Sequence, residues 1–392
     1  MKKVLLVWLA LLMITAVPLA AAEEKETPME EGTPFTLSSP SAVLMEAETG
    51  RVIFAKNADE RRPVASVTKV MTILLTLEAI DEGRVRVDDR VSVTEHAAGM
   101  GGSQAFLDAG GSYRLGDLLK SVIIASANDS AVALAEHLCG AEEAFVRRMN
   151  ERAKELGLED THYVNCTGLP AQEHYMSAGD VARLSAHLDQ HPLYYDYSTI
   201  WMDEIRHEGG RVTGLTNTNR LIRFYPGCDG YKTGSTNEAR YCISATAKKD
   251  GMRLIAVVLG NDASQSRFNE ARSMLEYGFA RYSLFRAIGK GDALGMTVPV
   301  RMGGSDEISV VSGGDASLLL RRGEEKAVSL EAALVENATA PVQAGDILGE
   351  IRVLLSGEAA AVVPAVAGES VGLPGMLHAL LRIRDRFMLF GW

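Results

Sequence analysis

Residues 62–77 read Arg-Pro-Val-Ala-Ser-Val-Thr-Lys-Val-Met-Thr-Ile-Leu-Leu-Thr-Leu, a polar turn that leads directly into an apolar segment. A helix that is apolar on nearly every face is a buried helix, so this segment predicts a core helix. Ser66 and Lys69 stand at its start, and their spacing places both side chains on one helical face. A desolvated lysine can lose its charge and accept the serine proton, while the helix N-terminus favours negative charge on the serine oxygen. The pattern therefore predicts an activated serine; the alternative is a polar first turn with a solvated lysine.

Two further short motifs follow in the chain. Ser126-Ala127-Asn128 lies within residues 123–130, and Lys232-Thr233-Gly234 lies within residues 227–235. Each of these motifs is common by itself. In the order Ser-x-x-Lys, Ser-x-Asn and Lys-Thr-Gly, however, they are the signature of penicillin-interacting serine enzymes.

The composition is that of a globular protein that is large enough for two domains. The chain has 392 residues, of which 47% are hydrophobic and 23% are charged. The formal net charge is −11, and it becomes −13 if a leader that contains Lys2 and Lys3 is removed. Such an acidic chain argues against nucleic acid as a partner.

The N-terminus has the pattern of an export signal. Lys2 and Lys3 precede an apolar run over residues 4–19, and three alanines at 20–22 offer a cleavage site of the Ala-x-Ala kind. We therefore expect residues 1–22 to be a cleaved signal peptide and the protein to act outside the cytoplasm. The alternative is an uncleaved N-terminal membrane helix, for which the apolar run is slightly short.

The cysteines and histidines do not indicate a cofactor or a catalytic metal. Cys139, Cys166, Cys228 and Cys242 form no Cys-x-x-Cys pair, and we interpret them as small buried hydrophobic residues. Export would permit a disulfide, but the spacing does not require one. The eight histidines form no motif of metal-ligand spacing.

Short apolar runs predict a first domain with strands at both ends and helices between them. The expected strands lie at residues 42–45, 52–55, 221–224, 241–247 and 254–259, and the expected helices at 115–126, 131–139, 144–156, 178–187 and 267–282. A sheet built in this way brings distant segments together and places Lys232-Thr233-Gly234 on or beside its edge. Beyond Gly291, β-type runs at 296–300, 308–311, 317–320, 328–334 and 347–355 alternate with glycine turns and predict a small all-β domain.

The C-terminal tail has a different pattern. Met376, Leu380, Ile383, Phe387 and Phe390 recur at helical spacing, with charged residues on the other side. We expect an amphipathic helix over residues 374–392 that binds a membrane surface, because exposed large apolar side chains at a terminus would otherwise be a liability. The alternative is a helix that packs on the protein's own β domain.

With these motifs in place, the sequence resembles the low-molecular-mass penicillin-binding proteins, which are serine-type D-alanyl-D-alanine carboxypeptidases, and in particular the Gram-positive and sporulation-associated kind. The matching stretches are residues 62–69, 123–129, 165–169, 217–221 and 225–234. The resemblance implies an α+β fold of the DD-peptidase and β-lactamase type, in which helices flank an antiparallel sheet. It also implies a catalytic domain over residues 23–284, a small all-β domain over 288–371 and the amphipathic anchor over 374–392.

The resemblance further implies a substrate and a role for each motif residue. The substrate would be the D-Ala-D-Ala end of the peptidoglycan stem peptide, and β-lactams would be covalent inhibitors. Ser66 would attack the penultimate carbonyl, Lys69 would be its base, and Ser126 would relay a proton to the leaving amine. Asn128 would orient the substrate and the Lys69 amine. The terminal carboxylate of the substrate would be bound by Lys232, Thr233 and Arg267. The main-chain N–H groups of Ser66 and of Ser235, the residue after Gly234, would form the oxyanion hole. Repulsion from Lys232 would lower the pKa of Lys69.

Three other functions use some of the same features. A class A β-lactamase also needs a glutamate in a Glu-x-x-Leu-Asn setting, and no such pattern occurs between Ser126 and Lys232. A transpeptidase or endopeptidase would use the same residues with another acceptor or scissile bond. A catalytically silent wall-binding scaffold belongs to a different class, and the intact polar positions of the motifs argue against it.

Overall fold

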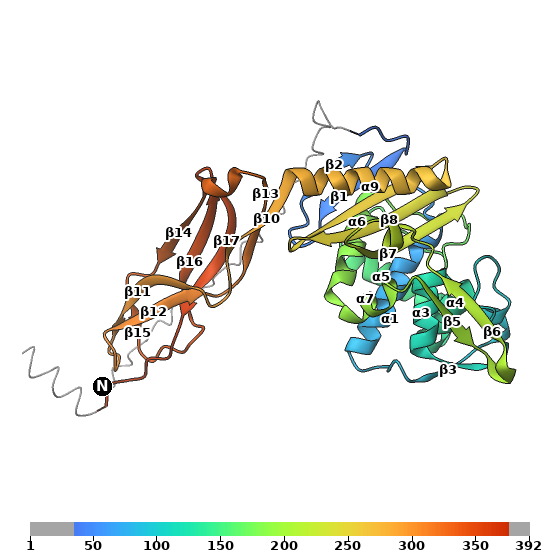
Figure 1. Ribbon diagram of the computed structural model, residues 1–392. Helices are drawn as coiled ribbons and strands as arrows, with labels where there is room; N and C mark the ends of the chain where they lie inside the picture. Colours follow the sequence, from blue (N-terminus) through green and yellow to red (C-terminus); the bar gives the residue numbers. More distant parts are fainter. Residues whose placement is uncertain (1–34, 376–392) are drawn as a thin grey trace, which may run out of the picture.

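The computed structural model of the chain describes residues 35–375, which form a larger body of helices and strands followed by an elongated β domain (Figure 1). The predicted signal peptide and almost all of the predicted C-terminal helix lie outside the described residues. Within residues 35–375, every helix is too short or too polar to cross a lipid bilayer.

The larger body is built on an antiparallel sheet of five strands in the order β2-β1-β9-β8-β7. Its strands are β1 (Ser41–Glu46), β2 (Val52–Lys56), β7 (Cys228–Thr236), β8 (Arg240–Lys249) and β9 (Met252–Asn261). The order makes β7, which carries the Lys-Thr-Gly motif, an edge strand. The prediction that this motif lies at the edge of the sheet is therefore confirmed.

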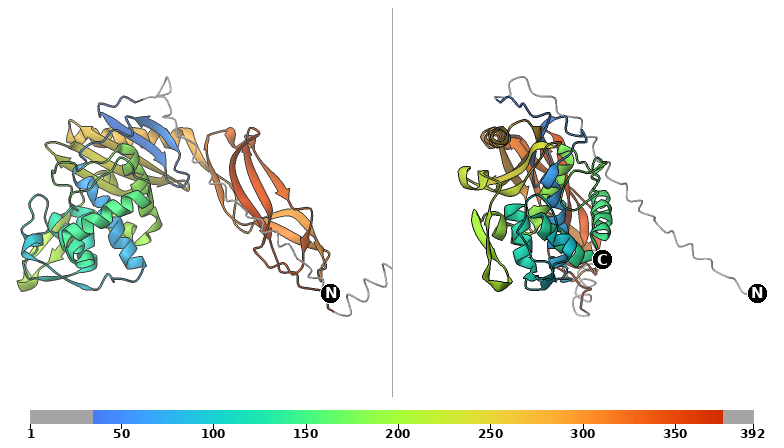
Figure 2. Two further views of the ribbon diagram at one scale, coloured as in Figure 1. Left: turned by 180° about the vertical axis from the view of Figure 1, so that it is seen from behind. Right: turned by 90° about the vertical axis from the view of Figure 1, so that its right-hand side faces the viewer.

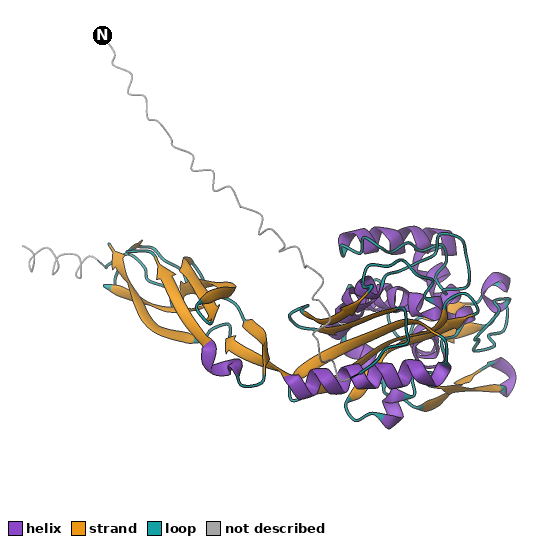
Figure 3. Cartoon of the chain, turned by 90° about the horizontal axis from the view of Figure 1, so that it is seen from above, coloured by secondary structure: helices purple, strands orange, loops and turns teal. Residues whose placement is uncertain are grey.

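Helices cover both faces of this sheet, which explains why its strands are apolar on both sides (Figure 3). In β1, Val43 and Met45 face one hydrophobic core, whereas Ala42 and Leu44 face the other. One long helix, α9 (Ser264–Arg281), covers the second core. The first core contains residues of the helices α1 (Lys69–Asp81), α3 (Leu115–Ala125), α4 (Asn128–Cys139), α5 (Glu142–Glu155) and α6 (Ala178–His187).

Helix α1 is the predicted core helix. All of its residues from Lys69 to Leu77 are buried, and Lys69 has no exposed surface. The turn that precedes it is a short 3-10 helix, η1 (Ala65–Thr68). Ser66 in this turn is half-buried and lies just before the buried helix α1.

Short elements complete the larger body. They are the helical turns α2 (Glu95–Ala98), η2 (Leu188–Gln190), α7 (Pro192–Ser198), η3 (Glu208–Gly210) and α8 (Leu221–Phe224), and the hairpins β3 (Arg90–Ser92) with β4 (Ser112–Arg114) and β5 (Met202–Arg206) with β6 (Val212–Thr216). The predicted strand at residues 221–224 is wrong, because this segment is the single helical turn α8. The Asn219 Oδ1 atom accepts a hydrogen bond from the Leu221 N–H at the start of that turn.

The β domain has a core of its own. Its six-stranded sheet has the order β14-β16-β17-β12-β11-β15, and β10 pairs separately with β13. The bounds are β10 (Tyr282–Ile288), β11 (Ala293–Arg301), β12 (Glu307–Ser312), β13 (Ala316–Arg321), η4 (Glu324–Ala327), β14 (Val328–Leu334), β15 (Ala338–Thr339), β16 (Ile347–Leu355) and β17 (Glu358–Ala367). The predicted small all-β domain is confirmed, and β10, β15 and β17 are strands that the sequence pattern did not predict.

The two bodies meet where α9 leads directly into β10 (Figure 2). Leu319 of β13 is buried against the second core of the larger body, and its carbonyl accepts a hydrogen bond from Arg51 at 3.0 Å. The Arg322 side chain donates in turn to the carbonyl of Phe279 near the end of α9. Hydrogen bonds from arginine side chains to main-chain carbonyls, together with apolar contacts, therefore join the two domains. These contacts add to the covalent link where α9 continues into β10.

Candidate active site

Ser66 and Lys69 form a close pair at the junction of η1 and α1. Lys69 Nζ lies 2.9 Å from Ser66 Oγ, and it also donates to the carbonyl of Thr167 at 2.6 Å. Burial of the ammonium group lowers the pKa of Lys69 to about 7, because desolvation penalises the charged form. The half-buried Ser66 hydroxyl thus contacts an amine that is substantially neutral at neutral pH. Such an amine can accept the hydroxyl proton.

The loop of residues 165–169 supplies the second contact to the Lys69 amine. Asn165 Oδ1 accepts hydrogen bonds from the main-chain N–H groups of Thr167 and Gly168, at 3.1 and 2.7 Å. Gly168 has a φ of +79°, and a Cβ atom there would lie 1.9 Å from the carbonyl oxygen of Ala65, so only glycine fits. Thr167 acts through a main-chain carbonyl, which any residue type provides. Its role was therefore missed in the sequence, where the only signal was the resemblance at residues 165–169.

His174 connects the start of α1 to the segment before the 165–169 loop through two hydrogen bonds. Its Nδ1 atom accepts a hydrogen bond from the Val164 N–H at 3.1 Å, so the ring proton is assigned to Nε2, which lies 2.8 Å from Thr68 Oγ1. Burial lowers the pKa of His174 to about 4, and nearby His162 and Lys69 add repulsion. The neutral ring thus ties the residue before Lys69 to the segment that leads into the Thr167 loop. The sequence analysis did not single out His174.

Ser126 and Asn128 lie where α3 ends and α4 begins. Ser126 adopts the left-handed conformation, with φ 63° and ψ 31°, which is uncommon for a residue other than glycine and is found in strained functional segments. Asn128 Nδ2 donates to the carbonyl of Gly101 at 2.6 Å. Asn128 Oδ1 has no hydrogen-bond partner, and Lys69 Nζ bonds to Ser66 and Thr167 instead, so the expected contact between Asn128 and the Lys69 amine is not formed.

Strand β7 presents its motif to the serine. Lys232 Nζ is buried and donates to the carbonyl of Thr233 at 3.0 Å, and the Thr233 hydroxyl donates to Thr218 Oγ1 at 2.8 Å. Burial holds the pKa of Lys232 well below its usual value, with further lowering by Lys69 and Arg267. Burial, rather than repulsion from Lys232, is the main cause of the lowered pKa of Lys69.

Gly234 allows the strand and the serine turn to touch. A Cβ atom at this position would lie 2.5 Å from the Val64 carbonyl oxygen and 2.9 Å from the Ser66 main-chain nitrogen. Ser235, the next residue, is exposed at this junction. The main chain of β7 thus passes directly beside the Ser66 N–H, which is the arrangement in which two main-chain donors can face one oxyanion.

Arg267 reaches the strand from α9, on the opposite side of the sheet. Its Nη1 atom donates to the carbonyls of Gly234 at 2.8 Å and Cys242 at 3.1 Å. Burial lowers the pKa of Arg267 to about 10, although Cys242 and Tyr241 oppose this effect. In this structure, the guanidinium contacts the strand main chain.

Several buried polar atoms around the motifs have no hydrogen-bond partner. Within residues 35–375 these atoms include Ser126 Oγ, Asn128 Oδ1 and Arg267 Nε. Buried polar atoms are usually satisfied, so an unpartnered atom calls for an explanation. All three residues were predicted from the sequence to take part in catalysis or substrate binding.

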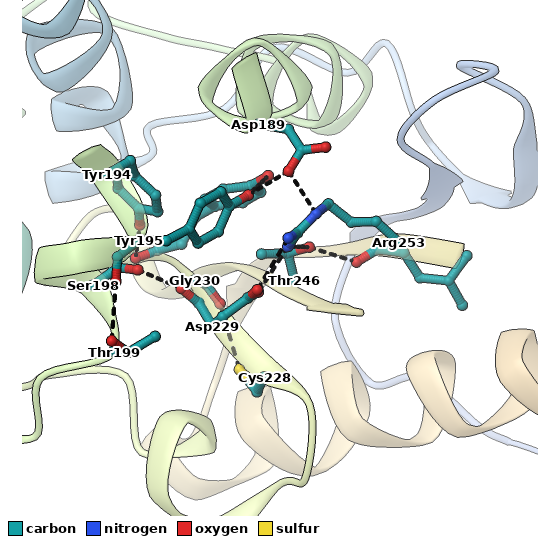
Figure 4. A network of polar contacts seen from close by, with 12 residues as sticks. Asp189, Tyr194, Tyr195, Ser198, Thr199, Cys228, Asp229, Gly230, Thr246 and Arg253 are labelled. Atoms are coloured by element: carbon teal, nitrogen blue, oxygen red, sulfur yellow. Dashed lines mark hydrogen bonds and ion pairs between the residues drawn. The ribbon is translucent and has the colours of Figure 1, made fainter. Parts of the chain in front are cut away.

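A network of charged and aromatic side chains anchors the start of β7 (Figure 4). The buried Arg253 guanidinium makes two contacts to the Asp229 carboxylate, at 2.7 and 3.0 Å, and an ion pair with Asp189 at 2.7 Å. The Tyr195 hydroxyl donates to the same Asp189. Since Asp229 precedes the motif by only three residues, this network fixes the part of the strand from which Lys232 projects.

The comparisons with known proteins agree with this geometry. Residues 25–263 match the family model for D-alanyl-D-alanine carboxypeptidase, and residues 282–372 match that for the C-terminal domain of penicillin-binding protein 5. The chain is 38% identical over 375 residues to D-alanyl-D-alanine carboxypeptidase DacF of Bacillus subtilis, with 95% of each chain covered. It is 34% identical to DacC of Escherichia coli over 349 residues, with 86% of each chain covered.

Solved structures show the same likeness in three dimensions. Penicillin-binding protein 5 from Haemophilus influenzae superposes with a TM-score of 0.75 at 29% sequence identity. The match covers 87% of this chain and 99% of the Haemophilus influenzae chain. The protein PBP3 from Streptococcus pneumoniae gives a TM-score of 0.71 at 27% sequence identity. This match covers 86% of our chain and 100% of the Streptococcus pneumoniae chain. With the serine–lysine pair and both domain matches in place, the chain belongs to the family of serine-type D-alanyl-D-alanine carboxypeptidases.

Proposed function

We propose that the enzyme removes the terminal D-alanine from peptidoglycan stem peptides through an acyl-enzyme on Ser66. The Lys69–Ser66 pair carries this proposal, because a buried amine with a pKa of about 7 lies 2.9 Å from a half-buried hydroxyl. An acyl transfer needs such a nucleophile and base, together with donors for the oxyanion and a cation for the free carboxylate.

The reaction has two steps. Ser66 Oγ gives its proton to neutral Lys69 Nζ and forms a bond to the carbonyl carbon of the penultimate D-alanine. The C–N bond then breaks, and Ser126 relays a proton to the departing amine of the terminal D-alanine. In the second step a water molecule gives a proton to Lys69 and bonds to the ester carbon, and the bond from that carbon to Ser66 Oγ breaks. Lys69 returns the proton to Ser66 Oγ, and the shortened peptide leaves with a new carboxylate.

The remaining motif residues bind and orient the substrate. Lys232 and Thr233 contact the terminal carboxylate, whose charge raises the pKa of Lys232 and keeps it cationic. The main-chain N–H groups of Ser66 and Ser235 bind the oxyanion, which is consistent with the close approach of β7 at Gly234. Asn128 Oδ1 accepts a hydrogen bond from a substrate amide. Arg267 holds the Gly234 carbonyl and adds positive charge near the carboxylate.

A β-lactam enters the same reaction as a covalent inhibitor. Ser66 opens the strained amide, and the acyl group stays attached because the leaving group remains tethered and deacylation is slow. Rapid penicillin turnover by the purified protein would contradict this expectation.

The test combines adduct mapping with product analysis. We expect mass spectrometry to find a penicillin adduct on Ser66, and a synthetic peptide that ends in D-Ala-D-Ala to lose one D-alanine. Ser66→Ala should abolish both results, while Ser329→Ala on the exposed face of β14 should change neither. An adduct on another residue, or D-alanine release by Ser66→Ala, would overturn the assignment.

The same site could act on a cross-linked peptide or transfer the acyl group to another amine. Product analysis separates these reactions: an endopeptidase would cleave a cross-linked dimer, and a transpeptidase would join the acyl group to an added acceptor amine. Free D-alanine and a shortened monomer are the products that we expect.

We infer that the protein is exported and acts at the outer face of the cytoplasmic membrane. Residues 1–22 would direct export, and residues 374–392 would bind the membrane surface. The β domain, proposed here as residues 288–371, would then hold the catalytic domain, residues 23–284, away from the bilayer. The elongated shape of the β domain supports this arrangement (Figure 2).

A further inference from the structure

A pocket lies between α8 and the first half of α9. It has a volume of about 280 Å³, which is enough for one side chain of a peptide. Leu221 and Phe268 line it with buried apolar surface, and Arg220 and Arg272 line it with guanidinium groups. The pocket therefore combines an apolar wall with positive charge.

The arginines of this pocket have no acidic partner. Arg220 Nη1 contacts only the amide oxygen of Gln265, at 3.4 Å, and Arg272 Nη2 donates to the Phe224 carbonyl at 2.7 Å. In the part of the chain that the structure describes, neither guanidinium forms an ion pair with a carboxylate. Glu276, one turn further along α9 from Arg272, is exposed, and among residues 35–375 it forms no ion pair with this arginine.

Two further arginines strengthen the positive charge on this side of the sheet. Arg223 lies over the rings of Trp201 and Phe224, with its guanidinium carbon 5.5 and 5.7 Å from the ring centroids. Arg267 lies nearby on α9 and bonds only to main-chain carbonyls. A protein with a net charge of −11 thus keeps four arginines together without a carboxylate partner among its described residues. An uncompensated cluster of this kind attracts anions.

The position of the pocket connects it to the reaction. Arg220 follows Thr218 by two residues, and Thr218 accepts the hydrogen bond of the Thr233 hydroxyl on the catalytic strand. The first turns of α9 contribute Gln265 and Asn269, whose amide groups can donate hydrogen bonds, and a helix N-terminus favours negative charge.

We propose that this pocket binds an aliphatic carboxylate of the peptidoglycan stem peptide, on a strand next to the one being cleaved. The proposal rests on the proposed function, since it takes the substrate class from the catalytic site. The apolar wall of Leu221 and Phe268 accommodates a methylene chain, while Arg220 and Arg272 pair with the carboxylate at its end. A phosphate polymer has no such chain and would be better bound by a flat polar surface.

The experiment separates this pocket from the catalytic cleft. The full-length protein is first acylated with penicillin, so that the cleft is filled. It is then titrated by calorimetry with a soluble disaccharide tetrapeptide, with the same compound after amidation of its side-chain carboxyls, and with a glycerol-phosphate oligomer. We expect the free acid to bind, the amidated compound to bind at least fivefold more weakly, and 0.5 M salt to weaken binding through screening.

Variants then assign the binding to the pocket. Arg220→Gln and Arg272→Gln should each weaken binding of the tetrapeptide by about five- to tenfold, since each removes one charged hydrogen-bond donor group. Arg147→Gln, an exposed arginine on α5, is the matched control and should bind like the wild type. The comparison of free and amidated ligand uses the unaltered protein, so it does not depend on the folding of any variant.

Two outcomes would overturn the inference. The first is equal binding of the free and amidated peptides, or no peptide binding at all, by a protein that penicillin has acylated normally. The second is stronger binding of the glycerol-phosphate oligomer than of the peptide, which would assign the pocket to a phosphate polymer. Failure of penicillin to acylate Ser66 would count against the catalytic assignment instead.

Discussion

At the scale of single residues, the proposed role of Lys69 as the base rests on the removal of its ammonium group from water. The carbonyl of Thr167 and the hydroxyl of Ser66 are its hydrogen-bond partners, and neither is charged. A buried ammonium without a carboxylate at hydrogen-bond distance gives up its proton more easily than a solvated one. Lys69 can therefore act as a base close to neutral pH, which an exposed lysine cannot do.

The pH dependence of acylation follows from this pKa. Lys69 accepts a proton only when it is neutral, so the rate of penicillin acylation should rise with pH and reach half its plateau near pH 7. Lys69→Arg should lower the plateau by at least about 10²-fold, because a guanidinium stays protonated. Stopped-flow measurement of acylation between pH 5 and pH 9 checks both statements. A profile that is flat across pH 7, or that survives Lys69→Arg unchanged, would exclude Lys69 as the base.

His174 should act as a positioning residue for the base. Removing its ring in His174→Ala leaves the Val164 N–H without its acceptor and Thr68 Oγ1 without its donor, at a cost of about 1–3 kcal/mol of stability. Water can then approach Lys69, so the midpoint of the acylation profile should move from about 7 toward the ordinary lysine value of 10.5. His174→Gln keeps one donor and one acceptor and should restore part of the shift. A lower Tm with an unmoved midpoint would mean that His174 has only a structural role.

At the scale of elements, the site depends on the contact between β7 and η1. Both segments are rigid, because β7 is hydrogen-bonded to β8 along its length and η1 leads into the buried helix α1. Arg267 supports the strand from the α9 side, and the Arg253 network anchors its start. Rigid supports on both sides keep the reacting groups within the small tolerance that catalysis allows.

Gly234→Ala tests this contact. The added methyl group would lie 2.5 Å from the Val64 carbonyl oxygen, so strand and turn must separate by several tenths of an ångström or more. Since small displacements of catalytic groups cost about 10²-fold in rate, acylation by fluorescent penicillin should fall by that order. Gly214→Ala on β6, where a Cβ atom meets no neighbour within 4 Å, is the matched control and should label normally. Normal labelling of a folded Gly234→Ala protein would show that the contact is not needed.

At the scale of the whole molecule, we propose that the larger body carries out the reaction and that the β domain sets its distance from the membrane. The catalytic motifs lie in the larger body, whereas the β domain has a separate core made of residues such as Ile308, Ile351 and Ala365. Leu319 and Arg51 couple the two bodies at one junction. A domain of this kind can set the distance of the site from an anchoring point without contributing to catalysis.

Deletion of residues 376–392 should therefore change where the enzyme works and not what it does. The deletion removes the apolar positions of the predicted amphipathic helix and leaves the described domains intact. The full chain without its signal peptide should co-sediment with anionic lipid vesicles, and the deleted chain should remain in the supernatant. Penicillin acylation in solution should be equal for the two proteins within about twofold. Equal sedimentation would show that the tail is not the anchor.

Most helices and strands could be predicted from local patterns. The apolar run after Ser66 was predicted to be a core helix, because a helix without a polar face is stable only in the protein interior. Residues 221–224 were misassigned because a four-residue apolar run does not distinguish a strand from a helical turn. The hydrogen bond that the Leu221 N–H donates to Asn219 Oδ1 favours the helical turn, and it depends on the neighbouring loop.

The sequence by itself determined the residue types of the proposed reaction: a serine and a lysine one turn apart, and the two later motifs in a recognisable order. Only the tertiary structure decided which groups set their properties. The Thr167 carbonyl, the His174 ring and the main-chain contacts of Arg267 come from segments distant in the chain. A main-chain carbonyl carries no residue signature, and the pKa of a lysine depends on how completely the folded protein excludes water from it.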